Sequence, residues 1–151
     1  MAGRAGRENL PGKVIIQTYN PNNFAIEYAK KQDYDLFYKT EIELRKQLNY
    51  PPFCDIILVG FVGENEEEII KTSQYMYELL RANLKKYNIN IFKPVPAPID
   101  KIQGKLRWRI IGKGIVTDEV NIIMNKILRK IFELNLKNTK VIIDVNPNNM
   151  L

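Results

Sequence analysis

From residue 54 to residue 146, the hydrophobic and polar positions follow the spacings of alternating strands and helices. Four segments have the pattern of strands, as continuous apolar runs or with period-two alternation: residues 55–62, 89–93, 105–111 and 141–145. Within the two longer gaps between them, apolar residues recur every three or four positions, as in amphipathic helices. The order strand–helix–strand–strand–helix–strand is that of the split βαβ, ferredoxin-like arrangement. We therefore predict an α+β domain, a four-stranded antiparallel sheet with two helices on one face.

Both predicted helices begin with a capping residue that is followed by carboxylates. Asn65 precedes three consecutive glutamates, and Thr117 precedes Asp118 and Glu119. Consecutive helical positions point around the helix axis, so three adjacent glutamates do not converge on a metal ion. We interpret them as charges that compensate the helix macrodipole.

The first 53 residues have a different pattern. Residues 14–19 predict a short strand, and residues 22–49 predict helix in two pieces that ends before Tyr50-Pro51-Pro52.

The proline-rich residues 94–98 predict a stiff extended connector, because proline cannot donate a ladder hydrogen bond. Since residues 55–62 are apolar on both sides, part of the second sheet face must be covered. The candidates are the helices of residues 22–49 or a domain outside this chain.

Positive charge is concentrated in the last third of the chain. There are 23 Lys and Arg against 17 Asp and Glu, a formal net charge of +6, and residues 101–151 hold ten basic but only four acidic side chains. Five cations without an intervening carboxylate are Lys101, Lys105, Arg107, Arg109 and Lys113. A local field of one sign predicts a polyanionic partner, the alternative being a solubilising surface.

Residues 105–111 place some of these cations on one face of a strand. Period-two alternation separates the cations Lys105, Arg107 and Arg109 from the apolar Leu106, Trp108 and Ile110. We expect all five cations of residues 101–113 to contact phosphate, so that shape and charge are recognised rather than base sequence. Trp108, the only tryptophan, is expected to face inward. The residues alone leave two rival functions open, a module that docks an acidic peptide tail and an RNA- or ribosome-associated protein.

Composition excludes several kinds of chemistry. The chain has one cysteine and no histidine, which excludes an internal disulfide, a Cys/His metal cluster and a histidine base. We predict no metal site, and we interpret Cys54 as a buried, inert thiol. No apolar run reaches the roughly 20 residues of a membrane span, and no signal peptide is visible, so we expect a cytoplasmic protein without membrane contact. The chain contains no Walker A sequence.

Motifs along almost the whole chain occur together in one known family. Residues 2–7, Ala-Gly-Arg-Ala-Gly-Arg, resemble the end of its last helicase motif, and residues 50–53, Tyr-Pro-Pro-Phe, resemble the entry into its terminal domain. Residues 94–98, residues 104–109 with Arg-Trp-Arg, and residues 144–147 match further stretches. On these residues the chain resembles the C-terminal end of primosomal protein N′ (PriA), the family of bacterial replication-restart helicases.

The resemblance implies a piece of an ATP-dependent 3′→5′ DNA helicase that acts in primosome assembly. Residues 1–20 would be a remnant of the second helicase lobe, residues 21–53 a helical connector, and residues 54–151 the C-terminal DNA-binding and partner-docking domain. Family arginines that match Arg4 and Arg7 bind nucleotide. ATP, Mg²⁺ and structural zinc are expected in the full-length parent. No cofactor and no ATP hydrolysis are expected of this piece alone, which lacks the Walker motifs.

The resemblance also implies partners and a location. They are forks and single strands of DNA, the single-stranded-DNA-binding protein and other primosome components. The piece itself is expected to be a monomer, and the parent to be cytoplasmic and associated with the nucleoid.

Overall fold

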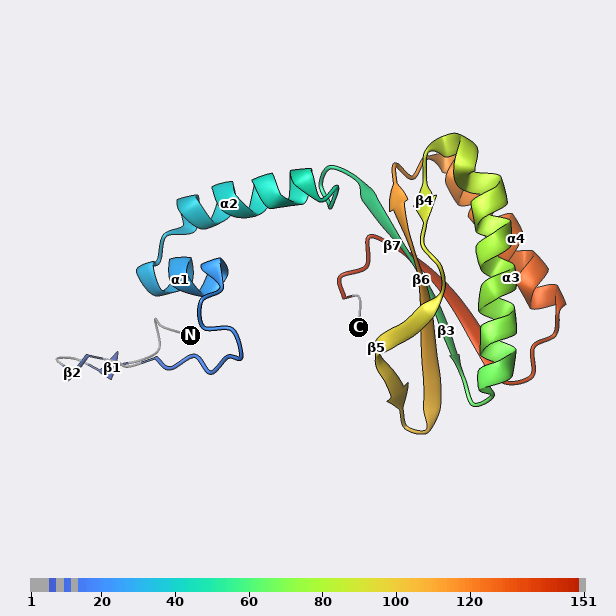
Figure 1. Ribbon diagram of the computed structural model, residues 1–151, viewed down its shortest axis with the longest axis horizontal. Helices are drawn as coiled ribbons and strands as arrows, with labels where there is room; N and C mark the ends of the chain where they lie inside the picture. The colour runs from blue at the N-terminus through green and yellow to red at the C-terminus, as the bar shows by residue number, and fades with distance from the viewer. Residues whose placement is uncertain (1–5, 8–9, 12–13, 150–151) are drawn as a thin grey trace. The chain divides into compact units, whose positions relative to one another are not determined.

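The structure is a computed structural model that describes residues 6–7, 10–11 and 14–149. The chain divides into two compact units, residues 1–43 and residues 44–151 (Figure 1). The boundaries inferred from the sequence, after residues 20 and 53, stay predictions.

The first unit is built mainly from two helices, α1 (Phe24–Lys31) and α2 (Tyr34–Gln47), the second of which continues into the next unit. This confirms the two helical pieces predicted within residues 22–49. Asn23 caps α1, because its side-chain oxygen accepts a hydrogen bond of 2.9 Å from the Ala25 amide. Gln32 ends α1 in the left-handed conformation, with φ of 55°.

The strand predicted for residues 14–19 is wrong. These residues have no regular secondary structure, and Ile15 is 81% exposed. A strand needs a neighbour for its backbone hydrogen bonds, and the only strands in the described part of this unit pair with each other, β1 (Gly6–Arg7) with β2 (Leu10–Pro11). Apolar β-branched composition without a partner is therefore insufficient to make a strand.

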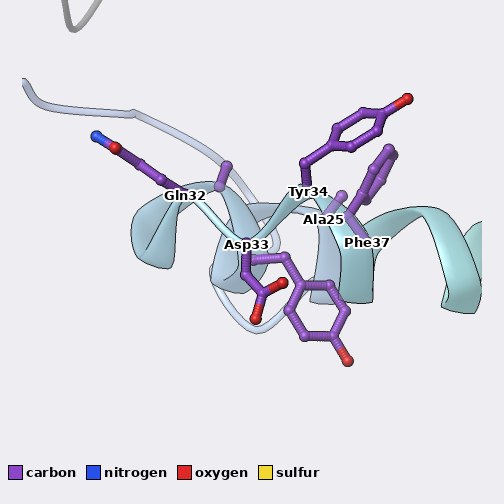
Figure 2. Close-up of a pocket in the computed structure, with 7 residues that line it drawn as sticks. Ala25, Gln32, Asp33, Tyr34 and Phe37 are labelled. Carbon is purple, nitrogen blue, oxygen red and sulfur yellow. The ribbon is translucent and has the colours of Figure 1, made fainter.

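Aromatic side chains hold α1 and α2 together. Phe24 of α1 contacts Phe37 of α2 with ring centroids 6.3 Å apart, and within α2 the Tyr34 ring contacts Phe37 at 6.4 Å. A shallow apolar pocket of about 380 Å³ lies between the helices, where Tyr34 and Phe37 project from the start of α2 and Ala25 from α1 (Figure 2). Residues 24–31 and 34–47 are all described, and none of them is fully buried.

The second unit is an antiparallel sheet with α3 (Glu66–Leu84) and α4 (Asp118–Glu133) on one side (Figure 1). The long strands are β3 (Asp55–Gly63), β6 (Lys105–Gly114) and β7 (Thr139–Val145). The sheet order is β4-β6-β3-β7, with β5 also pairing with β6. This order confirms the predicted ferredoxin-like split βαβ topology.

The edge strand beside β6 is divided into β4 (Asn90–Ile91) and β5 (Val95–Ile102). Both pieces pair with β6, and the register of β5 shifts between Pro96 and Lys101. The prediction that residues 94–98 only connect was therefore wrong. Residues 95–98 belong to the edge strand. The sheet has five strands in four positions, because β4 and β5 share the position beside β6. An edge strand tolerates proline because its outward backbone groups need no hydrogen-bond partner within the sheet.

The core lies between the sheet and the two helices. Its fully buried side chains include Ile57, Val59 and Phe61 of β3, Met76 and Leu80 of α3, and Val120 and Ile131 of α4. The helices begin at the predicted caps: Asn65 accepts a hydrogen bond from the Glu68 amide at 3.0 Å, and Thr117 accepts one from the Val120 amide at 3.4 Å. Local signals start both helices, and their apolar stripes then complete the core.

A short helical turn, η2 (Lys85–Tyr87), follows α3 and leads into β4. Asn88 ends this turn in the left-handed conformation, with φ of 56°. The sharp change of direction brings β4 back to the free side of β6.

Candidate nucleic-acid interface

Strand β6 lies inside the sheet, and its alternating residues face opposite sides. Ile110 is 1% exposed, and Leu106 and Trp108 pack against the core beneath the helices. This confirms the inward position predicted for Trp108. Because side chains alternate along a strand, Lys105, Arg107, Arg109 and Lys113 share the face without helices.

The register shows what lies beside each cation on this helix-free face. Arg109 pairs with Gly60 of β3, which pairs in turn with Ile142 of β7. No heavy atom of the described residues lies within 4 Å of the position that a Cβ on Gly60 would occupy. The surface of the sheet is therefore recessed at Gly60, between the side chains of Arg109 and Ile142. A ligand can approach the backbone of β3 at this low surface.

The next cross-strand row carries two cations. Arg107 pairs with Val62 of β3, and Val62 pairs with Lys140 of β7. Lys140 is exposed and Arg107 is half-buried. Sequence reasoning missed Lys140. Because Val141 and Ile143 alternate as inward residues, the sequence places Lys140 on the helix-free face of the sheet. Only the strand register shows that Lys140 lies in the same cross-strand row as Arg107.

The helix-free face changes its charge along the strands. In another cross-strand row, Ile111 of β6 pairs with Leu58 of β3, and Leu58 pairs with Asp144 of β7. Positive charge therefore gathers at the end where β6 begins, and a carboxylate lies nearer the opposite end. Such a gradient favours a polyanion at the Lys105 end of the face.

Lys101 does not join the other cations. The register pairs it with Leu106, so its side chain lies on the side of the sheet that carries the helices, at the tip of the β5–β6 hairpin. Its exposed neighbour Ile102 pairs with Lys105 and lies on the helix-free side. A phosphate contact of Lys101 stays a prediction, and it would involve a different surface.

Lys113 lies on the helix-free face but has partners within the chain. Its Nζ is 3.6 Å from the centroid of the Tyr50 ring and donates a hydrogen bond of 3.4 Å to the Leu48 carbonyl. The segment that follows α2 thus covers this end of the sheet, where Ile56 is buried. A phosphate contact of Lys113 stays a prediction, and it would compete with the contact to Tyr50.

Cys54 lies at the entrance of β3 and is 4% exposed, which confirms that it is buried. Its Sγ donates a hydrogen bond of 2.8 Å to the Asn49 carbonyl. Burial raises the pKa of the thiol, opposed by the nearby charge of Lys113. A raised pKa keeps the thiol protonated, which disfavours a nucleophilic or metal-binding role.

The nucleotide and metal predictions concern other parts of the chain. Arg4 lies outside the described residues, and Arg7 falls in β1. Among the described residues, no group of three or more His, Cys, Asp or Glu side chains could hold a metal ion. In the same residues, no helix combines the length and apolarity that a membrane span requires.

Comparisons with known proteins extend over the whole chain. Residues 46–148 match the family model described as "Primosomal protein N C-terminal domain". The "Replication restart protein PriA" of Bacillus subtilis is 32% identical over 152 residues, covering 100% of this chain and 19% of that protein. The protein of the same description from Synechocystis is 41% identical over 113 residues, 75% of this chain and 14% of its own length.

Two solved structures align with part of the chain at low sequence identity. The de novo designed protein Foldit4 aligns with a TM-score of 0.47 and 14% identity, over 64% of this chain and 99% of its own. A second designed protein, with a ferredoxin fold, aligns with a TM-score of 0.43 and 17% identity, over 63% of this chain and 86% of its own.

The sequence matches confirm the resemblance inferred from the motifs. The chain spans less than a fifth of the length of these two curated relatives. Since the family model covers more than half of the chain, the chain belongs to the family of primosomal protein N C-terminal domains.

Proposed function

We propose that the sheet domain binds the phosphate backbone of single-stranded and branched DNA through the helix-free face of β6. The single observation that carries this proposal is the shared face of Lys105, Arg107 and Arg109, beside the low surface at Gly60. Guanidinium and ammonium groups bind phosphate oxygens without reading base sequence. Trp108 packs against the core on the opposite side of the sheet, so it supports the strand and does not face a ligand bound by these cations.

The family gives this binding its setting. The relatives are described as replication restart proteins. We propose that the chain acts within a longer ATP-dependent 3′→5′ helicase, where ATP, Mg²⁺ and zinc are bound largely by other parts and Arg4 and Arg7 contact nucleotide. Docking of the single-stranded-DNA-binding protein and of primosome components, and association with the nucleoid, belong to the same proposal.

The test measures fluorescence anisotropy of labelled ligands with the 151-residue chain at two salt concentrations. The ligands are a DNA fork, single-stranded DNA, RNA and an acidic peptide. The site variant changes Lys105, Arg107 and Arg109 to Ala, and the matched control changes Lys126, Arg129 and Lys130 of α4 to Ala, which removes the same charge. The salt slope is the fall of log K against log salt concentration, and on single strands each phosphate contact contributes about 0.7 to it. Losing three contacts should therefore reduce the slope of the site variant by about 2. The same loss should weaken its binding about 100-fold at 0.1 M salt.

Three results would contradict the proposal. Equal losses in both triple variants would indicate a general field rather than a site. Loss of peptide binding with DNA binding retained would favour an acidic-peptide module. A clear preference for RNA over every DNA ligand would favour the ribosome-associated alternative.

A further inference from the structure

A basic pocket lies at the end of the sheet where β3 ends, β6 begins and the α4–β7 loop returns. Its volume is about 340 Å³. Three lysines from separate segments line it, Lys105 of β6, Lys137 of the loop and Lys140 of β7, together with one carboxylate, Glu64. The lining therefore carries a net charge of +2, and two of its three lysines lie outside the cationic strand described above.

The loop that carries Lys137 is held in a fixed position. Glu68 of α3 accepts hydrogen bonds from the Asn138 amide at 3.2 Å and from the Thr139 hydroxyl at 2.6 Å. Gly63 permits the close approach of this loop to β3, because a Cβ at Gly63 would collide with the Asn138 carbonyl oxygen. The glutamate that the sequence assigns to helix-dipole compensation thus also anchors a loop 70 residues away.

The lysines of the pocket are available to an anion. All three are exposed, and within the part of the chain that the structure describes none of them forms an ion pair with a carboxylate within 4 Å. A lysine side chain in this state retains its charge and donors for a ligand.

The pocket is continuous with the cationic face of β6. Lys105 belongs to both, and Arg107 shares a row with Lys140 across Val62. Two strand spacings of about 4.8 Å separate the Cα atoms of Arg107 and Lys140 by about 10 Å. At the other end of the face, Asp144 repels phosphate and Lys113 contacts Tyr50.

We propose that Lys137 and Lys140 form a second set of phosphate contacts, so that a bound DNA strand crosses the sheet from β6 to the start of β7 instead of following β6 toward Lys113. This inference rests on the proposed function. It adds two binding residues and a direction for the strand across the domain.

The test uses the 151-residue chain and a labelled 20-nucleotide oligothymidylate, titrated between 50 and 200 mM salt. Lys137 and Lys140 are changed together to Gln, and the charge-matched control changes Lys126 and Lys130 of α4 to Gln. Two lost contacts should reduce the salt slope by about 1.4 and weaken binding about 25-fold at 0.1 M salt. The control should weaken it less than threefold.

A second measurement uses the unmodified protein. Lysine acylation is mapped by mass spectrometry with and without the oligonucleotide, and binding should protect Lys105, Lys137 and Lys140 but leave Lys126 reactive. Protection confined to Lys105, or equal weakening by both Gln pairs, would overturn the crossing path. If Lys137→Gln/Lys140→Gln binds normally while the β6 triple variant does not, the crossing path fails and the proposed function stands. If the unmodified chain binds no DNA, both fail.

Discussion

The helical hairpin of α1 and α2 and the sheet domain begin helices with the same local signal but differ in packing. An asparagine side chain caps both α1 and α3. The sheet domain encloses Ile57, Val59 and Phe61 completely, whereas no residue of α1 or α2, all of them described, is fully buried. The start of each helix is thus set locally here, while a buried core depends on surfaces brought together by the sheet.

The difference in packing between the two units can be measured because one optical signal, tryptophan fluorescence, comes from one unit alone. The only tryptophan, Trp108, lies in the sheet domain, so its fluorescence reports on that unit. Circular dichroism reports on helices of both units. Phe61 with Phe37 and Asn65 with Asn23 are matched changes in the two units, and the other two changes fall within the sheet domain.

The largest effect is expected from removal of a buried ring. Phe61→Ala should lower the free energy of unfolding by about 3–5 kcal/mol, because it leaves a cavity beneath both helices. Phe37→Ala removes a ring that is only partly buried, and its aromatic contacts are worth about 0.5–1.5 kcal/mol each. Urea unfolding followed by Trp108 fluorescence should detect the first change and not the second. Equal shifts would show that the hairpin stabilises the sheet domain.

Two glycines of β3 should respond in opposite ways. Gly63→Ala should destabilise by about 1–3 kcal/mol, because the Asn138 carbonyl must move away. Gly60→Ala meets open space and should be neutral or stabilising by up to about 1 kcal/mol, since alanine loses less backbone entropy in a strand. Thermal unfolding followed by Trp108 fluorescence distinguishes them. A stable Gly63→Ala protein would contradict the anchored loop on which the proposed pocket depends.

Removal of the two asparagine caps gives a smaller effect and a direct comparison. Asn65→Ala should lower the stability of the sheet domain by about 1 kcal/mol, because the Glu68 amide loses its acceptor. Asn23→Ala removes the equivalent bond to the Ala25 amide. It should reduce helical circular dichroism without shifting the Trp108 transition. A shift in that transition would again indicate coupling between the units.

The smallest effect is expected at alkaline pH. Burial raises the pKa of Cys54, so the folded protein keeps a proton that the unfolded chain releases above about pH 8.5. The resulting stabilisation is present below the unfolded pKa and is lost as pH rises through the folded pKa. Cys54→Ser does not titrate, so its stability should fall less steeply between pH 8 and 10. Parallel pH curves would contradict the raised pKa.

The sequence predicts those features that depend on neighbouring residues. Asn65 and Thr117 mark the helix starts, and period-two alternation places Trp108 inside and Arg107 and Arg109 on the other side. It also predicts the order of elements, because each spacing is periodic over its own segment. The alternation alone is therefore sufficient to group the cations of one strand.

Features that depend on register could not be predicted in this way. Lys140 joins Arg107 only through the pairing of β7 with β3, and Lys101 leaves the group through the pairing of β5 with β6. Lys113 lies on the predicted face, but Tyr50 reaches it from a segment 63 residues earlier. Residues 14–19 have strand composition without a paired strand in the described chain. In each case a contact distant in sequence determines the outcome.

The divided edge of the sheet affects how copies of this domain could associate. Prolines at positions 94, 96 and 98, in β5 or directly before it, lack amide donors, and prolines along an edge disfavour pairing with an incoming strand. At the opposite margin, within the described part of the chain, β7 pairs with β3 on one side and with no strand on the other. Fibril growth by edge addition needs two competent margins on every copy, whereas one margin permits a single pairing event. The prolines therefore disfavour repeated extension of this sheet through the β4–β5 edge.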